Sequence, residues 1–117
     1  MPNPEDLLPL TPAVLHILLA LADGEKHGYA IMQEVEKISS GQITMGPGTL
    51  YGSIKRMLPM GLIVETEQRG VPGQDDERRR YYRLSDFGSR VLDAETQRLE
   101  MLLAAMHRKL IWKRGEQ

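Results

Sequence analysis

The 117-residue sequence predicts a mainly α-helical fold with one β-hairpin, in which a compact N-terminal domain is followed by one long helix. Three observations lead to this prediction. Three short segments before residue 60 carry apolar residues at helical spacing. Two later segments alternate apolar and polar residues around a loop rich in Gly, Pro and Asp, which is typical of a hairpin. A helical pattern then runs almost to the end of the chain. The expected division is residues 1–84 and residues 85–117.

Composition excludes several classes of protein. Hydrophobic residues make up 41% of the chain and charged residues 26%, which is ordinary for a globular protein. The absence of cysteine excludes a disulfide scaffold and a thiolate metal site, and it is compatible with a reducing cytoplasm. No apolar run reaches the roughly 18 residues that span a bilayer, and the N-terminus does not look like a secretion signal. We therefore expect a cytoplasmic protein without a membrane segment.

The overall charge counts against a simple nucleic-acid binder, because the net charge is -1 and the pI is near 6.3. Local charge on the contacting face matters more than the total. Cationic side chains crowd the middle of the chain: Lys55, Arg56, Arg69, Arg78, Arg79, Arg80 and Arg83. Acidic residues 75–77 interrupt this region.

The first two helices are expected to build the core. Residues 1–10 contain three prolines and should be irregular. Thr11 and Pro12 form a strong helix start, and the helix that runs to about Ala22 is apolar almost all round, as in a central core helix. A second helix should run from His27-Gly28 to about Ser39, with a buried stripe of Ile31, Met32, Val35 and Ile38.

The third helix lies within residues 46–63, GPGTLYGSIKRMLPMGLI, and is expected to present its polar side. Gly52 is a poor helix former, costing about 1 kcal/mol relative to Ala, but it lets another surface come close. Pro59 should end the helix and Gly61 should turn the chain. One face is apolar, with Leu50, Ile54, Met57, Leu58 and Gly61, whereas Thr49, Tyr51, Gly52, Lys55 and Arg56 lie on the other side or its shoulders. Such a cationic helix suits a groove lined with phosphates.

The hairpin should pair residues 62–68 with residues 79–84. Tyr81 and Tyr82 then point to opposite faces, so one is expected in the core and the other on the surface. The arginines at 78–80 have two interpretations. They either contact DNA or form ion pairs across the hairpin with Glu65 or Glu67, and we expect at most one or two to touch DNA.

The last helix is expected to start after Ser85, with Asp86 favourable to the helix dipole. It should continue to about Trp112, which is roughly 42 Å at 1.5 Å per residue. Apolar residues at near-heptad spacing form a seam along this helix: Leu92, Leu99, Leu103, Met106 and Leu110. The body is too small to cover this seam, so a second copy in a two-fold homodimer is expected to do so. Trp112 either anchors the helix end on the partner or stacks on an effector.

The predicted order of elements is three helices, a hairpin and a long helix. This order is the winged helix-turn-helix plan. In that plan the third helix enters a major groove and the hairpin forms a wing beside it. Lys55 and Arg56 are therefore expected to donate to phosphates or guanine edges, and Thr49 and Tyr51 to phosphate or base edges. Near the wing, the candidates are Arg69, Arg78, Arg79 and Arg80.

Three segments in order, HGYAIMQEV, GPGTLYGSIKRMLPMGLI and RRRYYRLSDFG, resemble the PadR-like transcriptional regulator family over about residues 10–110. The resemblance implies a homodimeric DNA-binding repressor, and in some relatives a small aromatic or hydrophobic effector. It also implies DNA contacts by Tyr29, Thr49, Tyr51 and Lys55. From the two-fold dimer we expect a near-palindromic operator. The chain departs from the family at two places. Pro59 is expected to shorten the recognition helix, and the acidic residues 75–77 in the wing loop count against strong contact of the wing with phosphates.

Three other interpretations compete with this one. The acidic wing and the pI of 6.3 favour a winged helix that contacts another protein. A small enzyme lacks support, because no nucleophile elbow or GxxxxGK loop occurs. A MarR-like dimer would need helices at both ends of the chain. The three histidines, His16, His27 and His107, are scattered and do not form a zinc site, so no metal or cofactor is expected.

Overall fold

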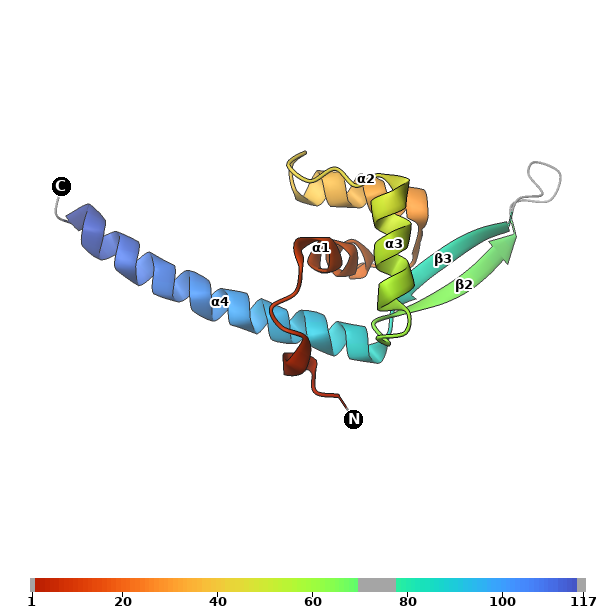
Figure 1. Ribbon diagram of the computed structural model, residues 1–117. Helices are drawn as coiled ribbons and strands as arrows, with labels where there is room; N and C mark the ends of the chain where they lie inside the picture. The colour runs from red at the N-terminus through yellow and green to blue at the C-terminus, as the bar shows by residue number, and fades with distance from the viewer. Residues whose placement is uncertain (1, 70–77, 116–117) are drawn as a thin grey trace.

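The computed structural model describes the backbone of residues 2–69 and 78–115, with side chains over residues 2–66 and 80–110. A short 3-10 helix, η1, precedes three helices, a hairpin and a long helix that projects from the body (Figure 1). The predicted fold class, mainly helical with a winged helix-turn-helix arrangement and a long C-terminal helix, is confirmed. The elements are η1 (Pro4–Leu7), α1 (Pro12–Leu21), β1 (Lys26–His27), α2 (Gly28–Ile38), α3 (Pro47–Met57), β2 (Ile63–Arg69), β3 (Arg78–Leu84) and α4 (Asp86–Gly115).

The hairpin is part of a three-stranded antiparallel sheet in the order β1-β3-β2. Strands β2 and β3 pair from Ile63 opposite Leu84 to Arg69 opposite Arg78. The alternating pattern in the sequence predicted two strands and did not reveal β1, because two residues are too short for such a pattern to be seen. Lys26 pairs with Tyr82, so β1 ties the hairpin to the start of α2.

Helix α1 is the central core helix, as predicted. It packs against α2, α3, α4 and β3. The hydroxyl of Thr11 accepts a hydrogen bond from the backbone N–H of Val14 at 3.3 Å, which confirms the predicted N-cap. Tyr82 is buried and Tyr81 is half-exposed, as expected of neighbours on one strand. The core comprises Ile17, Leu18, Ala20, Leu21, Ile31, Val35, Met45, Leu50, Ile54, Met57, Leu62, Ile63, Tyr82 and Val91.

Two residues predicted to be buried are exposed. Ile38 is 39% exposed because it is the last residue of α2, and Ser40 and Gly41 turn the chain away with positive φ angles of 53° and 80°. Gly61 is exposed because α3 ends at Met57 and the following turn, with φ 77° at Gly61, leaves the helical face. A helical face can be extrapolated from sequence only as far as the helix itself extends.

The base of α4 is fixed to the start of the hairpin. The hydroxyl of Ser85 accepts from the N–H of Gly88 at 2.9 Å and donates to the carbonyl oxygen of Gly61 at 2.5 Å, which confirms Ser85 as the cap. A Cβ at Gly88 would lie 2.0 Å from the carbonyl oxygen of Leu62, so only glycine permits this close approach. Helix α4 ends at Gly115, three residues beyond the predicted Trp112, whose side chain lies outside the described residues.

Candidate nucleic-acid interface

Helix α3 has one buried side and one exposed side. Leu50, Ser53, Ile54 and Met57 are buried, whereas Thr49, Tyr51, Lys55 and Arg56 are exposed. Glycine at position 46 and proline at position 47 start the helix, with Pro at its first position. All four candidate contacts predicted in α3 therefore reach solvent. Ser53 is a buried polar residue that the sequence analysis did not anticipate.

Tyr51 lies against the first residue of α2. A Cβ at Gly28 would be 2.2 Å from the Tyr51 hydroxyl oxygen, so the phenol occupies the space that a side chain would take. Tyr51 is still 47% exposed, and Tyr29, the next residue along α2, is 62% exposed. Two candidate contacts from different helices thus meet around the N-terminus of α2.

His27 fixes this N-terminus. Its Nδ1 accepts a hydrogen bond from the N–H of Ala30 at 3.3 Å, so the imidazole serves as the N-cap of α2, which begins at the predicted His27-Gly28. The same ring packs edge-on against Tyr81 of β3, with the centroids 5.5 Å apart. The His27 side chain therefore adds a contact between the hairpin and the tyrosine-bearing end of α2, beside the backbone pairing of β1 with β3.

The two cations of α3 differ in how they are held. Nη2 of Arg56 donates to the hydroxyl of Ser53 at 3.3 Å, so its guanidinium lies back along the helix beside Gly52. Within the described part of the chain, neither a hydrogen bond nor an ion pair engages Lys55. Lys55 is thus the cation of α3 that is free to reach a phosphate or a base edge.

The wing arginines are only partly described. Nε of Arg80 lies 3.4 Å from a carboxylate oxygen of Glu65, so the second interpretation, an ion pair across the hairpin, holds for this arginine. Arg69, Arg78 and Arg79 occupy the distal ends of β2 and β3, with Arg69 opposite Arg78. Their side chains, and the acidic residues 75–77, lie outside the described residues.

The predicted seam of α4 is divided into two parts. Leu92 is half-buried and packs in part against the core of its own chain. The other four members are exposed, namely Leu99, Leu103, Met106 and Leu110. Met106 and Leu110 also line an apolar hollow of about 280 Å³ together with Ala105 and Lys109. The exposed part of the seam therefore begins only beyond the body.

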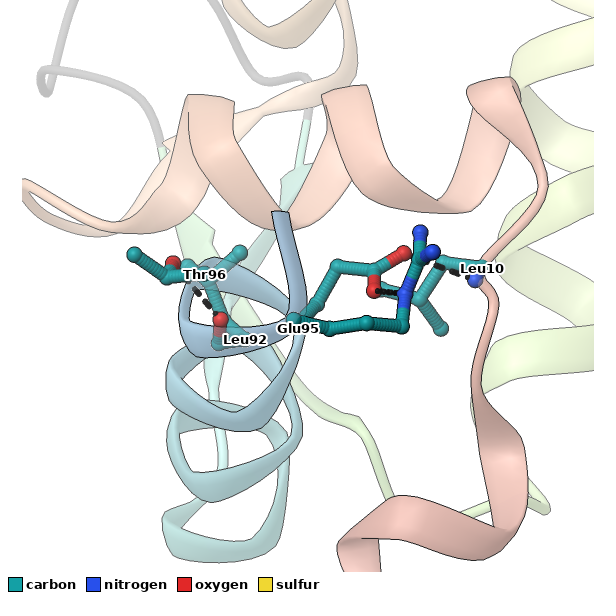
Figure 2. Close-up of polar contacts among 5 residues, drawn as sticks. Leu10, Leu92, Glu95 and Thr96 are labelled. Carbon is teal, nitrogen blue, oxygen red and sulfur yellow. Dashed lines mark hydrogen bonds and ion pairs between the residues drawn. The ribbon is translucent and has the colours of Figure 1, made fainter. Parts of the chain in front are cut away.

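Glu95 is a structural residue that was not predicted from the sequence. Its carboxylate is 1% exposed and accepts hydrogen bonds from the N–H of Leu10 and from Nε of Arg98 (Figure 2). The hydrogen bond from Arg98 holds the pKa of Glu95 below its ordinary value, although burial opposes this shift. The sequence signal was Glu95 four residues after the buried Val91, on the same face, with Arg98 three residues further on.

No helix in the described residues is long and apolar enough to cross a membrane. Three helices with an exposed cationic third member, a wing tied to the second helix and a projecting terminal helix define a winged helix-turn-helix protein. Residues 17–94 match the profile of the transcriptional regulator PadR-like family. The chain belongs to this family, as the motifs in the sequence indicated.

Two curated proteins are similar to this chain in sequence. Transcriptional regulator Rv3488 of Mycobacterium tuberculosis is 40% identical over 88 residues, which cover 75% of this chain and 76% of the relative. A 37.1 kDa protein in transposon TN4556 of Streptomyces fradiae is 34% identical over 90 residues, or 77% of this chain. The matched region spans only 24% of that second relative.

Solved structures share the fold. A PadR family transcription regulator from Clostridium difficile aligns with a TM-score of 0.70 at 23% identity, covering 86% of this chain and 99% of that one. The PadR protein of Bacillus subtilis, solved in complex with operator DNA, aligns with a TM-score of 0.62 at 22% identity. That alignment covers 74% of this chain and 47% of the B. subtilis chain.

Proposed function

We propose that this transcriptional regulator binds double-stranded DNA as a homodimer and represses transcription by occluding promoter DNA in the cytoplasm. The observation that carries the proposal is the exposed side of α3, on which Lys55 has no bonded partner among the described residues, while the opposite side is packed into the core. A helix held in this way can enter a major groove without rearrangement. The operator complex of the B. subtilis relative supports the same kind of partner here.

The neighbouring residues suit a DNA surface. Thr49, Tyr51 and Tyr29 offer hydroxyl groups that donate to phosphate oxygens or base edges. Arg56 adds a guanidinium that can exchange its hydrogen bond to Ser53 for a phosphate or guanine. The wing arginines, Arg69, Arg78, Arg79 and Arg80, would add phosphate contacts beside the groove, with Arg80 the least available because it faces Glu65.

The proposal of a second copy of the chain rests on the exposed apolar side of α4. Leu99, Leu103, Met106 and Leu110 expose an apolar stripe roughly 16 Å long, at 1.5 Å per residue over 11 positions. Two such stripes from two-fold related chains bury each other. The two α3 helices would then read half-sites about 10 to 10.5 bp apart, or a multiple of that distance, on a near-palindromic operator.

An effector of small hydrophobic or aromatic character would act through the same helix. The apolar hollow beside Met106 and Leu110 lies on the stripe that the partner covers. A ligand that prefers one packing of the two stripes shifts the dimer towards that state and changes the separation of the α3 helices. Release of DNA is then the expected response.

The test is DNA binding at two salt concentrations, using a duplex selected from a random library by the unaltered protein. Binding should be site-specific and should weaken as salt rises, because counterions are released from the phosphates. Lys55→Ala should lower the affinity by roughly tenfold, which corresponds to about 1.4 kcal/mol.

Lys37→Ala is the matched control, because Lys37 is exposed at the end of α2 and outside the candidate interface. Equal loss of affinity in both variants would contradict the role of Lys55. The absence of any site-specific binding by the unaltered protein would favour a winged helix that contacts another protein instead.

A further inference from the structure

Glu95 marks the point at which α4 leaves the body of the protein. Its Oε2 accepts from the N–H of Leu10 at 2.9 Å, and its Oε1 accepts from Nε of Arg98 at 2.5 Å (Figure 2). Among the α4 side chains that the structure describes, up to residue 110, it is the last that is fully buried. From residue 96 to residue 110 every side chain is exposed or half-buried.

The hydrogen bond from Leu10 connects α4 to the DNA-reading part of the fold. Leu10 directly precedes Thr11, the N-cap of α1, and α1 packs against both α2 and α3. A second point that holds α4 is Gly88, which lies against the carbonyl of Leu62, and Val91 between the two is buried in the core. These two points are seven residues apart, or about 10 Å along the helix, so together they define a direction.

A carboxylate is an unusual side chain at a fully buried position where two elements pack together. Burying a charge is costly, and an apolar side chain of similar volume often gives equal or greater stability. Apolar contacts, however, are not directional and permit small rotations. The hydrogen bonds of Glu95 have fixed donors and a preferred geometry, so they restrict the angle at which α4 projects.

Small errors in this angle become large at a distance. From Glu95 to the end of α4 is 20 residues, or about 30 Å, so a tilt of about 10° moves the far end by roughly 5 Å. That exceeds the rise of one base pair, about 3.4 Å. We propose that Glu95 is a positioning residue that sets the angle between α4 and the DNA-reading domain, and thereby the half-site spacing that the dimer accepts. The inference rests on the proposed function, because it presumes a dimer on DNA.

The angle can be measured within one chain. The protein has no cysteine, so Glu36→Cys on α2 and Arg108→Cys on α4 introduce two spin-label sites at exposed positions. Labelled protein diluted in unlabelled protein reports only the distance within a chain. We expect one narrow distance distribution in the unaltered background and a broad one with Glu95→Leu. Glu100→Leu, an exposed carboxylate of the same helix, is the control and should leave the distribution narrow.

A purely stabilising role predicts something else. Glu95→Leu would then change the unfolding temperature and leave the distance distribution of the folded protein narrow, which would overturn the inference. If Glu95→Leu does not fold, Glu95→Gln takes its place. Glutamine retains an acceptor for Leu10 but loses the charge that faces Arg98. Broadening is expected, and an unchanged width in folded Glu95→Gln would overturn the inference.

DNA spacing gives the second readout. In Glu95→Leu, α4 would project at the angle that permits DNA binding only about a tenth of the time. The variant should then bind the library-selected duplex about tenfold more weakly. On duplexes whose spacer is one base pair longer or shorter, the variant should lose less affinity than the unaltered protein does. Equal spacing selectivity in the two proteins would contradict the proposal. Sedimentation of the unaltered protein as a monomer would remove the proposed dimer, while the distances within the chain would still decide the role of Glu95.

Discussion

The hydroxyl of Tyr51 in α3 occupies the position that a side chain at Gly28 in α2 would fill. The phenol of Tyr51 therefore packs α3 against the first residue of α2. The same phenol also belongs to the candidate DNA surface. A change in the packing of α2 against α3 at this contact would therefore also move a side chain of the candidate interface.

Gly28→Ala should have a larger effect on the free energy of DNA binding than on the free energy of unfolding. The new methyl group would lie 2.2 Å from the Tyr51 oxygen, so the flexible phenol must swing away. We expect a severalfold loss of affinity, measured by fluorescence anisotropy on the selected duplex. In a Tyr51→Ala background the same change should have little further effect, because interacting residues are not additive. Independent losses in the double variant would contradict the coupling.

Gly88→Ala should destabilise the whole domain. Its methyl group would meet the carbonyl oxygen of Leu62 at 2.0 Å, and a backbone atom cannot move aside as a side chain can. We expect a loss of about 1–3 kcal/mol in the free energy of unfolding, as for overpacked cores. Urea unfolding measures it. Gly48→Ala in the first turn of α3, where a Cβ meets nothing within 4 Å, is the control and should be neutral or slightly stabilising.

Acid should remove the contribution of Glu95 to stability. Its pKa is lowered in the folded state by the hydrogen bond from Arg98, from an ordinary value of 4.5. A lowered pKa means that the unfolded chain binds the proton more tightly. The stabilisation is therefore complete above about pH 4.5 and is lost as the pH falls through the folded-state pKa.

Urea unfolding from pH 6 to pH 3 should show a shallower decline for Glu95→Gln than for the unaltered protein. The comparison variant is Asp23→Asn, which removes an exposed carboxylate whose pKa is lowered chiefly by its hydrogen bond to Lys26. Parallel declines in unaltered protein and Glu95→Gln would show that Glu95 does not contribute to the acid sensitivity.

Leu103→Glu should prevent dimer formation. Leu103 lies in the middle of the exposed apolar stripe, and an unpaired carboxylate there would be buried against the partner at a high cost. Sedimentation at micromolar concentration should show a monomer, and DNA affinity should fall because two half-sites are no longer bound together. Met101→Glu, on the opposite side of α4 and 74% exposed, should leave both properties unchanged. A dimeric Leu103→Glu would place the interface elsewhere.

The elements of the fold were largely predictable, because their signals are local. The Thr11-Pro12 start of α1, the His27 cap of α2 and the Ser85 cap of α4 depend on neighbours within a few residues. The strand β1 was not predictable, because two residues acquire their structure only from pairing with β3. Ile38 was misplaced because the end of a helix, not its period, decided its exposure.

The sequence by itself determined the order of the elements, the family and the two-sided character of α3, since these follow from residue types at short spacing. Only the tertiary structure decided that Arg56 lies back on Ser53 while Lys55 has no bonded partner among the described residues, that Tyr51 rests on Gly28, and that Glu95 faces Leu10. Glu95 and Leu10 are 85 positions apart in the chain. No local pattern reports such a pair, because it exists only once the chain has closed the loop between them.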